Sequence, residues 1–296
     1  MRPELKEATN LLRSTDPSKL DEALRLLQRT VYSFSMKVCG HREDAEDTMQ
    51  EVLLKSLPYL AKLKSPEALA VWLYKVTRNR CWMSRRRSKF APHETLALDD
   101  LMPDSAELDS LTSAPDRSPE QQTVSAQESS RVREAVLRIP PNYRFILVLH
   151  DMEGLDTSEV SKVTGLQEGT VRVRLHRARL FVRRELAGEG VAADLPRDRK
   201  ASAAKPANCR EIFANLSEYV DSHLDDATCE KMRKHLQFCP PCEAFVADLR
   251  RAIERCRQDE GFCEPATAEK LRNLLVQEYL QLSQSETSEG RSSTKV

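Results

Sequence analysis

The feature that most constrains this 296-residue chain is a cluster of cysteine and histidine in its last third. Of eight cysteines, two lie in the first two hundred residues, and six lie between Cys209 and Cys263. Within that block, His235, Cys239 and Cys242 have H-x3-C and C-x2-C spacings. If residues 224–238 form a helix, His235 lies in its last turn, and the Pro-Pro turn folds both thiols back beside it. Three such ligands need a fourth to complete a tetrahedral Zn2+ site.

Cys209, 26 residues before His235, is the leading candidate for the fourth ligand, and Cys229 and His223 compete with it. Four protein ligands leave no open coordination position, so the spacing predicts one structural or regulatory zinc site rather than a catalytic one. Cys256 and Cys263 match no part of this pattern. We interpret them as ordinary thiols in preference to a regulatory disulfide.

The rest of the chain has the composition of a helical protein. It has 8 glycines and 5% aromatic residues, and apolar residues recur every three or four positions from Leu20 to Val38. These features favour an all-α, multi-domain fold. No apolar run approaches the ~20 residues that span a bilayer, and the first residues lack a signal peptide's apolar segment. We therefore expect a cytoplasmic protein without membrane insertion.

The charges are segregated although 46 basic residues balance 46 acidic ones. Residues 78–89 carry six basic residues and no acid, and residues 169–184 carry six arginines and no acid. Between them, residues 93–130 hold nine acids and one base. Two basic segments joined by an acidic tether favour two modules that bind a polyanion, although solvated helix faces give the same pattern.

The second basic segment has the layout of a helix-turn-helix. A short helix over 157–163 meets a turn at Gly165, and a longer helix begins near Glu168. Four apolar residues fall on one face of the longer helix, and four polar ones fall on another. The apolar set is Val171, Leu175, Ala178 and Val182, and the polar set is Arg172, His176, Arg179 and Arg183. Such a helix suits the major groove of DNA, and an ordinary amphipathic surface helix is the alternative.

The string from Ile139-Pro-Pro-Asn-Tyr-Arg to Gly169-Thr-Val-Arg-Val-Arg-Leu-His-Arg-Ala-Arg resembles region 4 of extracytoplasmic-function (ECF) sigma factors. In that family, region 4 reads the −35 promoter element and touches the β flap of RNA polymerase. The resemblance implies a DNA-binding set on the longer helix: Arg172, Val173, Arg174, His176 and Arg177.

Two segments of the first block resemble region 2 of the same family. Asp44-Ala-Glu-Asp-Thr-Met-Gln-Glu-Val resembles the helix that docks on the polymerase β′ clamp, which implies contacts from Asp47, Gln50 and Glu51. Trp72-Leu-Tyr-Lys-Val-Thr-Arg-Asn-Arg-Cys-Trp resembles the promoter-melting segment. By that resemblance Asn79 reads an extruded −10 base, and nearby arginines hold the strand phosphates. Those arginines are Arg78, Arg80, Arg85 and Arg86.

The cysteine block resembles a zinc-binding anti-sigma domain, from Cys209 through Leu216-Ser-Glu-Tyr-Val-Asp-Ser-His-Leu-Asp to Cys242. In that family the domain is a small helical bundle that masks the polymerase-binding faces of a sigma factor. The resemblance implies a similar contact within this chain.

Together the motifs predict six segments. These are region 2 (8–91), an acidic linker (92–127), region 4 (128–187), a second linker (188–207), the zinc domain (208–257), and a tail with a possible amphipathic helix (258–296). The expected function is that of an ECF sigma factor, not an enzyme, which directs core RNA polymerase to promoter DNA under control of its zinc domain. The alternative is a DNA-binding transcription factor whose zinc domain is a structural or partner-docking module.

Overall fold

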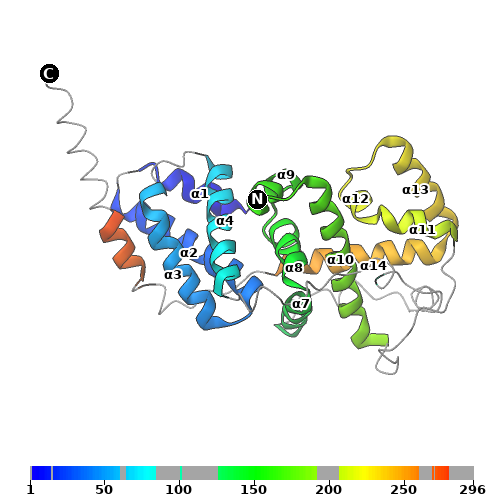
Figure 1. Cartoon of the computed structure of the whole chain (residues 1–296), viewed down its shortest axis with the longest axis horizontal. Coiled ribbons are helices and arrows are strands. Elements are labelled where there is room, and N and C mark those ends of the chain that lie inside the picture. The colour runs from blue at the N-terminus through cyan, green and yellow to red at the C-terminus, as the bar shows by residue number, and fades with distance from the viewer. Residues whose placement is uncertain are drawn as a thin grey trace, which may run out of the picture. The chain divides into compact units, whose positions relative to one another are not determined.

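The protein is described by a computed structural model, in which residues 2–14, 16–60, 65–84, 101, 126–191, 207–259, 269 and 271–279 are placed. These residues form helices and turns and contain no strand, which confirms the prediction of an all-α fold (Figure 1). None of the described helices is long and apolar enough to cross a membrane. The chain divides into two compact units, and each is described separately.

The first unit comprises residues 1–91, 153–166 and 260–296. Its described helices include α1 (Pro3–Leu11), α2 (Pro17–Cys39), α3 (Arg42–Leu60), α4 (Pro66–Ser84) and α9 (Thr157–Thr164). The leucine and valine stripe predicted from Leu20 to Val38 is buried on α2. This helix begins at the N-cap Asp16 and ends at Gly40, whose φ of 76° is left-handed and suits glycine.

One helix end of this unit differs from simple sequence rules, and another follows them. Pro58 lies inside α3, only two residues before the helix ends at Leu60, instead of interrupting it. A proline this close to the end still removes a backbone donor, but little helix follows it. Helix α9 begins with a capping box, in which Asp156 and Glu159 accept each other's backbone N–H, and it ends at the left-handed Gly165.

The second unit comprises residues 92–152 and 167–259. The helices of its first part are α7 (Ala126–Arg138), α8 (Pro141–Leu147) and the one-turn π-helix η2 (Val148–Met152). Helix α10 (Glu168–Val191) follows, and then α11 (Ala207–Ala214), α12 (Leu216–Val220), α13 (Asp226–Phe238) and α14 (Pro240–Gln258). Within this unit α14 packs against α10, α13 and η2, and α10 also contacts α8 and α12.

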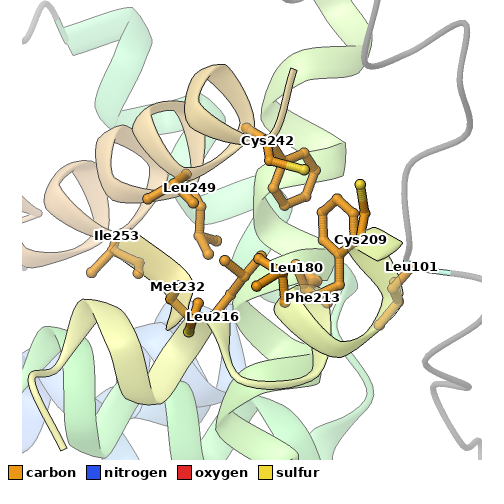
Figure 2. Packing of buried hydrophobic residues seen from close by; sticks show 12 residues of the cluster. Leu101, Leu180, Cys209, Phe213, Leu216, Met232, Cys242, Leu249 and Ile253 are labelled. Carbon is orange, nitrogen blue, oxygen red and sulfur yellow. The ribbon is translucent and has the colours of Figure 1, made fainter. Parts of the chain in front are cut away.

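The core of the second unit joins α10 to the four helices of the cysteine block. Leu180 of α10 is buried with Phe213, Leu216 and Leu249 (Figure 2). The rings of Phe213 and Phe245 meet edge to face, with centroids 5.0 Å apart. Cys209 and Cys242 belong to the same buried cluster. Two of the four predicted zinc ligands are therefore part of the core that holds these helices against α10.

Most of the predicted linkers, 92–127 and 188–207, lie outside the described residues. Where the chain is described at their edges, α7 already begins at Ala126 and α10 continues to Val191. In the tail, residues 271–279 are helical, within the predicted amphipathic stretch. The two compact units also divide residues 128–187, because residues 153–166 pack in the first unit and the remainder packs in the second.

Candidate functional site

Four side chains of the cysteine block converge on one point. The Sγ atoms of Cys209, Cys239 and Cys242 and a ring nitrogen of His235 all lie within 4.8 Å of one another. Helix α11 supplies Cys209, the last turn of α13 supplies His235, and the turn into α14 supplies the other two. Nε2 of His235 lies 3.7 Å from Sγ of Cys209 and 3.3 Å from Sγ of Cys242.

These distances fit a tetrahedral zinc site. With Zn–S near 2.3 Å and Zn–N near 2.0–2.1 Å, tetrahedral angles put nitrogen and sulfur about 3.6 Å apart. Burial and the neighbouring thiols of Cys209 and Cys239 raise the pKa of Cys242. Three adjacent thiols can therefore lose their protons together only beside a cation. The donor set and its spacing fit Zn2+. The ion would join three segments of the chain, and its four protein ligands would fill all of its coordination positions.

The two competitors for the fourth ligand lie elsewhere among the described residues. His223 is exposed, and Cys229 accepts a contact from Nη2 of Arg233 at 3.8 Å. The structure thus groups Cys209 with the H-x3-C-x2-C motif. Cys256 is buried in α14, and Cys263 lies outside the described residues.

The predicted DNA-binding face of α10 is divided along its length. Arg172 is exposed and pairs with Glu168 at 3.3 Å, and Val173 is 50% exposed. Arg174 and Arg177 are half-buried, whereas His176 is 7% exposed. The N-terminal turns of α10 therefore present side chains to solvent, and the following turns are covered by the cysteine-block helices of the same unit.

Arg179 is the centre of that covered face. Its Nε and Nη2 donate to Asp151 of η2 at 2.8 and 2.6 Å, and its Nη1 and Nη2 donate to Asp221, just after α12, at 2.7 and 2.9 Å. The side chains of Arg179 and Asp151 are both 0% exposed. Although burial acts to raise it, the pKa of Asp151 is lowered well below its usual range by the Arg179 charge and hydrogen bonds. One guanidinium thus holds two carboxylates in paired hydrogen bonds.

Two further residues of α10 contact the cysteine block. Arg183 donates from Nε to Asp248 of α14 at 2.8 Å, and its guanidinium lies 4.1 Å from the ring centroid of Phe245. Nδ1 of His176 lies 3.2 Å from Oγ of Ser217 in α12. Burial, followed by the charges of Arg179 and Arg177, lowers the pKa of His176 to about 4, so this ring is neutral near pH 7.

The predicted polymerase-binding residues lie together on α3. Asp47 and Gln50 are exposed, and Glu51 is half-buried. Glu51 accepts from Lys55 at 2.5 Å and also pairs with Arg80 of α4. The Lys55 hydrogen bond is the largest cause that lowers the pKa of Glu51. This face carries negative charge and is opposite the buried side of α3.

The residues predicted to contact the −10 promoter element have different environments. Asn79 is exposed. Arg78 is half-buried and donates from Nη1 to the carbonyl of Val163 in α9 at 2.7 Å, and its pKa is lowered by burial. Arg80 forms an ion pair with Glu51 of α3. Arg85 and Arg86 lie outside the described residues.

Sequence reasoning missed a second buried ionic cluster, in the first unit. Glu153 is 0% exposed at its side chain and accepts from Tyr74 Oη at 2.6 Å and from Lys37 Nζ at 3.1 Å, and it forms an ion pair with Arg2, whose Nε lies 2.7 Å away. These partners come from the N-terminus, α2 and α4. The tyrosine pKa is raised well above its usual value by burial and by Glu153. No sequence spacing links these four residues, so periodicity could not reveal the cluster.

Comparison with protein families identifies three segments of the chain. Residues 24–90 match "Sigma-70 region 2", residues 129–182 match "Sigma-70, region 4", and residues 209–242 match "Putative zinc-finger". The order is the one that the motifs predicted. The third match begins at Cys209 and ends at Cys242, the first and last members of the converging cluster.

Curated relatives are named sigma factors. A "Probable RNA polymerase sigma factor RfaY" of Xanthomonas campestris is 31% identical over 161 residues, 54% of this chain and 38% of the relative. An "ECF RNA polymerase sigma factor SigE" of Mycolicibacterium smegmatis is 32% identical over 169 residues, 56% of this chain and 61% of the relative. The "ECF RNA polymerase sigma factor SigW" of Bacillus subtilis is 23% identical over 182 residues, 62% of this chain and 96% of the relative.

The chain thus spans less than two thirds of the first two relatives and nearly all of the third. Two segments of the chain match sigma-70 region 2 and region 4, and similar proteins are named ECF sigma factors, so these comparisons confirm the resemblance inferred from the motifs. In this chain the two sigma-70 matches are followed by the segment that matches the putative zinc-finger. The relatives are transcription factors rather than enzymes.

Proposed function

We propose that this chain is an ECF-type sigma factor that binds core RNA polymerase, directs it to promoters and initiates transcription. The observation that carries the proposal is the presence of region 2 and region 4 in one chain, in that order. A plain DNA-binding regulator accounts for a helix-turn-helix but gives no role to region 2. Sigma function accounts for both, and it places the protein in the cytoplasm with the polymerase.

The contacts follow from the exposed faces of the two regions. The acidic face of α3 (Asp47, Gln50 and Glu51) binds the β′ clamp, and region 4 binds the β flap. Asn79 reads the −10 element, and arginines around it neutralise phosphates. Arg172 and Val173, at the exposed start of α10, read −35 base edges. The remaining DNA contacts of α10 are Arg174, His176 and Arg177.

Zn2+ binds Cys209, His235, Cys239 and Cys242 and fixes the fold of the cysteine block. The convergence of four donors with tetrahedral spacing supports this assignment. The metal supplies a cross-link among α11, α13 and α14. These helices in turn carry Phe213, Phe245 and Asp248, which pack on or pair with α10.

The zinc domain regulates the sigma regions in cis, and its docked form inhibits DNA binding. Three contacts support this proposal: Arg179 with Asp221, Arg183 with Asp248, and His176 with Ser217. They hold α10 from His176 onward against the cysteine block. Major-groove entry needs a helix free of such cover, so promoter recognition requires the zinc domain to leave α10.

Promoter-dependent transcription with purified core polymerase and the full-length chain tests the sigma assignment. A library of bacterial promoter fragments serves as template. Asp47→Lys reverses charge on the clamp-binding face and should abolish both core binding and transcripts. Glu22→Lys, on an exposed position of α2, serves as the matched control and should leave both unchanged. A chain that binds DNA fragments but neither binds core nor yields transcripts would establish the alternative DNA-binding regulator.

A further inference from the structure

Two cysteines outside the zinc site lie in contact inside the first unit. Cys39 is the last residue of α2, and Cys81 lies three residues before the end of α4. Their Sγ atoms are 3.0 Å apart, and the residues are 1% and 2% exposed. They are separated by 42 positions in the sequence, so only the packing of α2 against α4 brings them together.

The surroundings of Cys81 disfavour the ionised form of its thiol. Hydrogen bonding with Cys39 is the largest cause that raises the pKa of Cys81, followed by burial. The side chains of Thr48 and Ser35 also interact with Cys81 and act in the opposite direction. Cys81 therefore keeps its proton in the reduced pair.

We propose that Cys39 and Cys81 are a redox-active dithiol that a hydroperoxide oxidises to a disulfide between α2 and α4. The thiolate of one cysteine attacks the peroxide O–O bond, which gives a sulfenic acid and releases one water. The sulfur of the other cysteine then displaces the hydroxyl group, so that the S–S bond forms and a second water leaves. The two thiols lose two electrons and two protons in total, and hydrogen peroxide is reduced to two molecules of water.

The position of the pair at two helix ends provides access for a small oxidant. Cys39 is followed at once by Gly40, where α2 terminates, and Cys81 lies in the last turn of α4. Terminal turns open more readily than helix centres, and a peroxide is scarcely larger than water. Closing the sulfurs from 3.0 Å to the bonded distance of about 2.0 Å needs little backbone movement.

The disulfide has a structural consequence beside the −10 residues. It ties the end of α2 to α4 immediately after Asn79 and Arg80. Because it closes a loop of more than forty residues, oxidation should raise the melting temperature of the first unit on the order of 10 °C. The chemistry does not depend on sigma activity, so it can hold or fail independently of the proposed function.

Peroxide treatment of the zinc-loaded full-length protein, followed by peptide mapping, tests the proposal. After thiols are blocked, trypsin should release residues 38–42 joined to residues 81–85, because Lys37, Arg42, Arg80 and Arg85 border these peptides. The linkage should disappear on reduction. Tryptophan fluorescence should report the rise in melting temperature, because both tryptophans, Trp72 and Trp82, lie in α4.

Cys39→Ala should abolish both the linked peptide and the shift, while Cys229→Ala, a half-buried thiol outside the pair, should retain both. The mapping on the unaltered chain needs no variant, so it stays decisive if Cys39→Ala folds poorly. The proposal is overturned if peroxide links only cysteines of residues 209–263, or if residues 38–42 and 81–85 stay as separate reduced peptides at full zinc-site oxidation.

Discussion

Each of the two units contains a buried ionic cluster, and the charges at the centres of the two clusters are opposite in sign. In the first unit a single carboxylate, Glu153, is held by Arg2, Lys37 and Tyr74. In the second unit a single guanidinium, Arg179, is held by two carboxylates. The side chains of Glu153 and Lys37 are 0% and 2% exposed and that of Arg2 is 14% exposed, so the carboxylate at the centre of this cluster is shielded from solvent.

The Arg179 cluster also has a buried centre and reaches the surface through Asp221. Asp221 is 9% exposed at its side chain, and Arg257, 3.8 Å from it, is 47% exposed. Buried charges cost most when a partner is removed and no water can replace it. The Asp221 contact joins α10 to the zinc domain, and we expect it to be the contact that opens and re-forms. We expect the contacts of Glu153, which join segments of the first unit, to stay closed.

Loss of zinc should produce the largest effect, and only in the second unit. Replacing His235 with alanine should abolish stoichiometric metal binding and unfold the cysteine block, since structural zinc contributes on the order of 10 kcal/mol in small zinc domains. Co2+ absorbance measures the tetrahedral thiolate site. Tryptophan fluorescence should show unchanged urea unfolding of the first unit. His223→Ala, an exposed histidine outside the cluster, is the control and should bind metal normally.

Removal of the Glu153 carboxylate should cost the first unit about 3–5 kcal/mol of unfolding free energy. Glu153→Ala leaves Arg2 and Lys37 together in a buried site without their shared anion. Urea titration followed by tryptophan fluorescence gives the change. Glu46→Ala removes a carboxylate that pairs with Arg42 on the surface of α3, and it should cost less than about 1 kcal/mol. An equal loss of unfolding free energy in the two variants would show that the buried Glu153 ion pairs stabilise the unit no more than a surface ion pair does.

Weakening the Arg179 cluster should have a smaller effect, confined to the docking of the zinc domain on α10. Asp221→Asn removes one of two carboxylates, and a charged hydrogen-bond pair is worth about 1.5–3 kcal/mol, or roughly 10–100-fold in the docking equilibrium. Hydrogen exchange at residues 168–191 should accelerate accordingly. Asp226→Asn, at the exposed start of α13, is the control. Unchanged hydrogen exchange in the Asp221 variant would show that this cluster does not control the separation of the zinc domain from α10.

Acidification should have the smallest effect. The docked His176 has its pKa lowered to about 4, whereas an undocked histidine titrates near 6.5. Below pH 6.5 the undocked form binds a proton that the docked form excludes, so docking weakens as pH falls toward about 4 and is unaffected above 6.5. The fraction of molecules with the zinc domain docked on α10 should be lower at pH 5.5 than at pH 7.0. His176→Gln, which has no titrating ring, should be less pH-sensitive by the same measure.

The sequence predicted the elements well because they depend on local patterns. The periodicity of α2, the turn at Gly165 and the H-x3-C-x2-C spacing each need only neighbouring residues. The sequence could not predict that Arg179 and Arg183 are buried, because their partners Asp221 and Asp248 lie 42 and 65 residues away. Charge segregation favoured an arginine face for DNA. In this structure acidic residues of the zinc domain occupy part of that face instead.

Transcription by core polymerase with the full-length chain tests the central claim most directly. The unaltered protein is compared with Asp221→Ala combined with Asp248→Ala, which removes zinc-domain partners of Arg179 and Arg183 but leaves the sigma regions unchanged. Low promoter-dependent output from the unaltered chain and a rise of at least 10-fold, on the order expected for two lost charge pairs, would support inhibition in cis. Equal output from both proteins, with zinc bound in each, would contradict it.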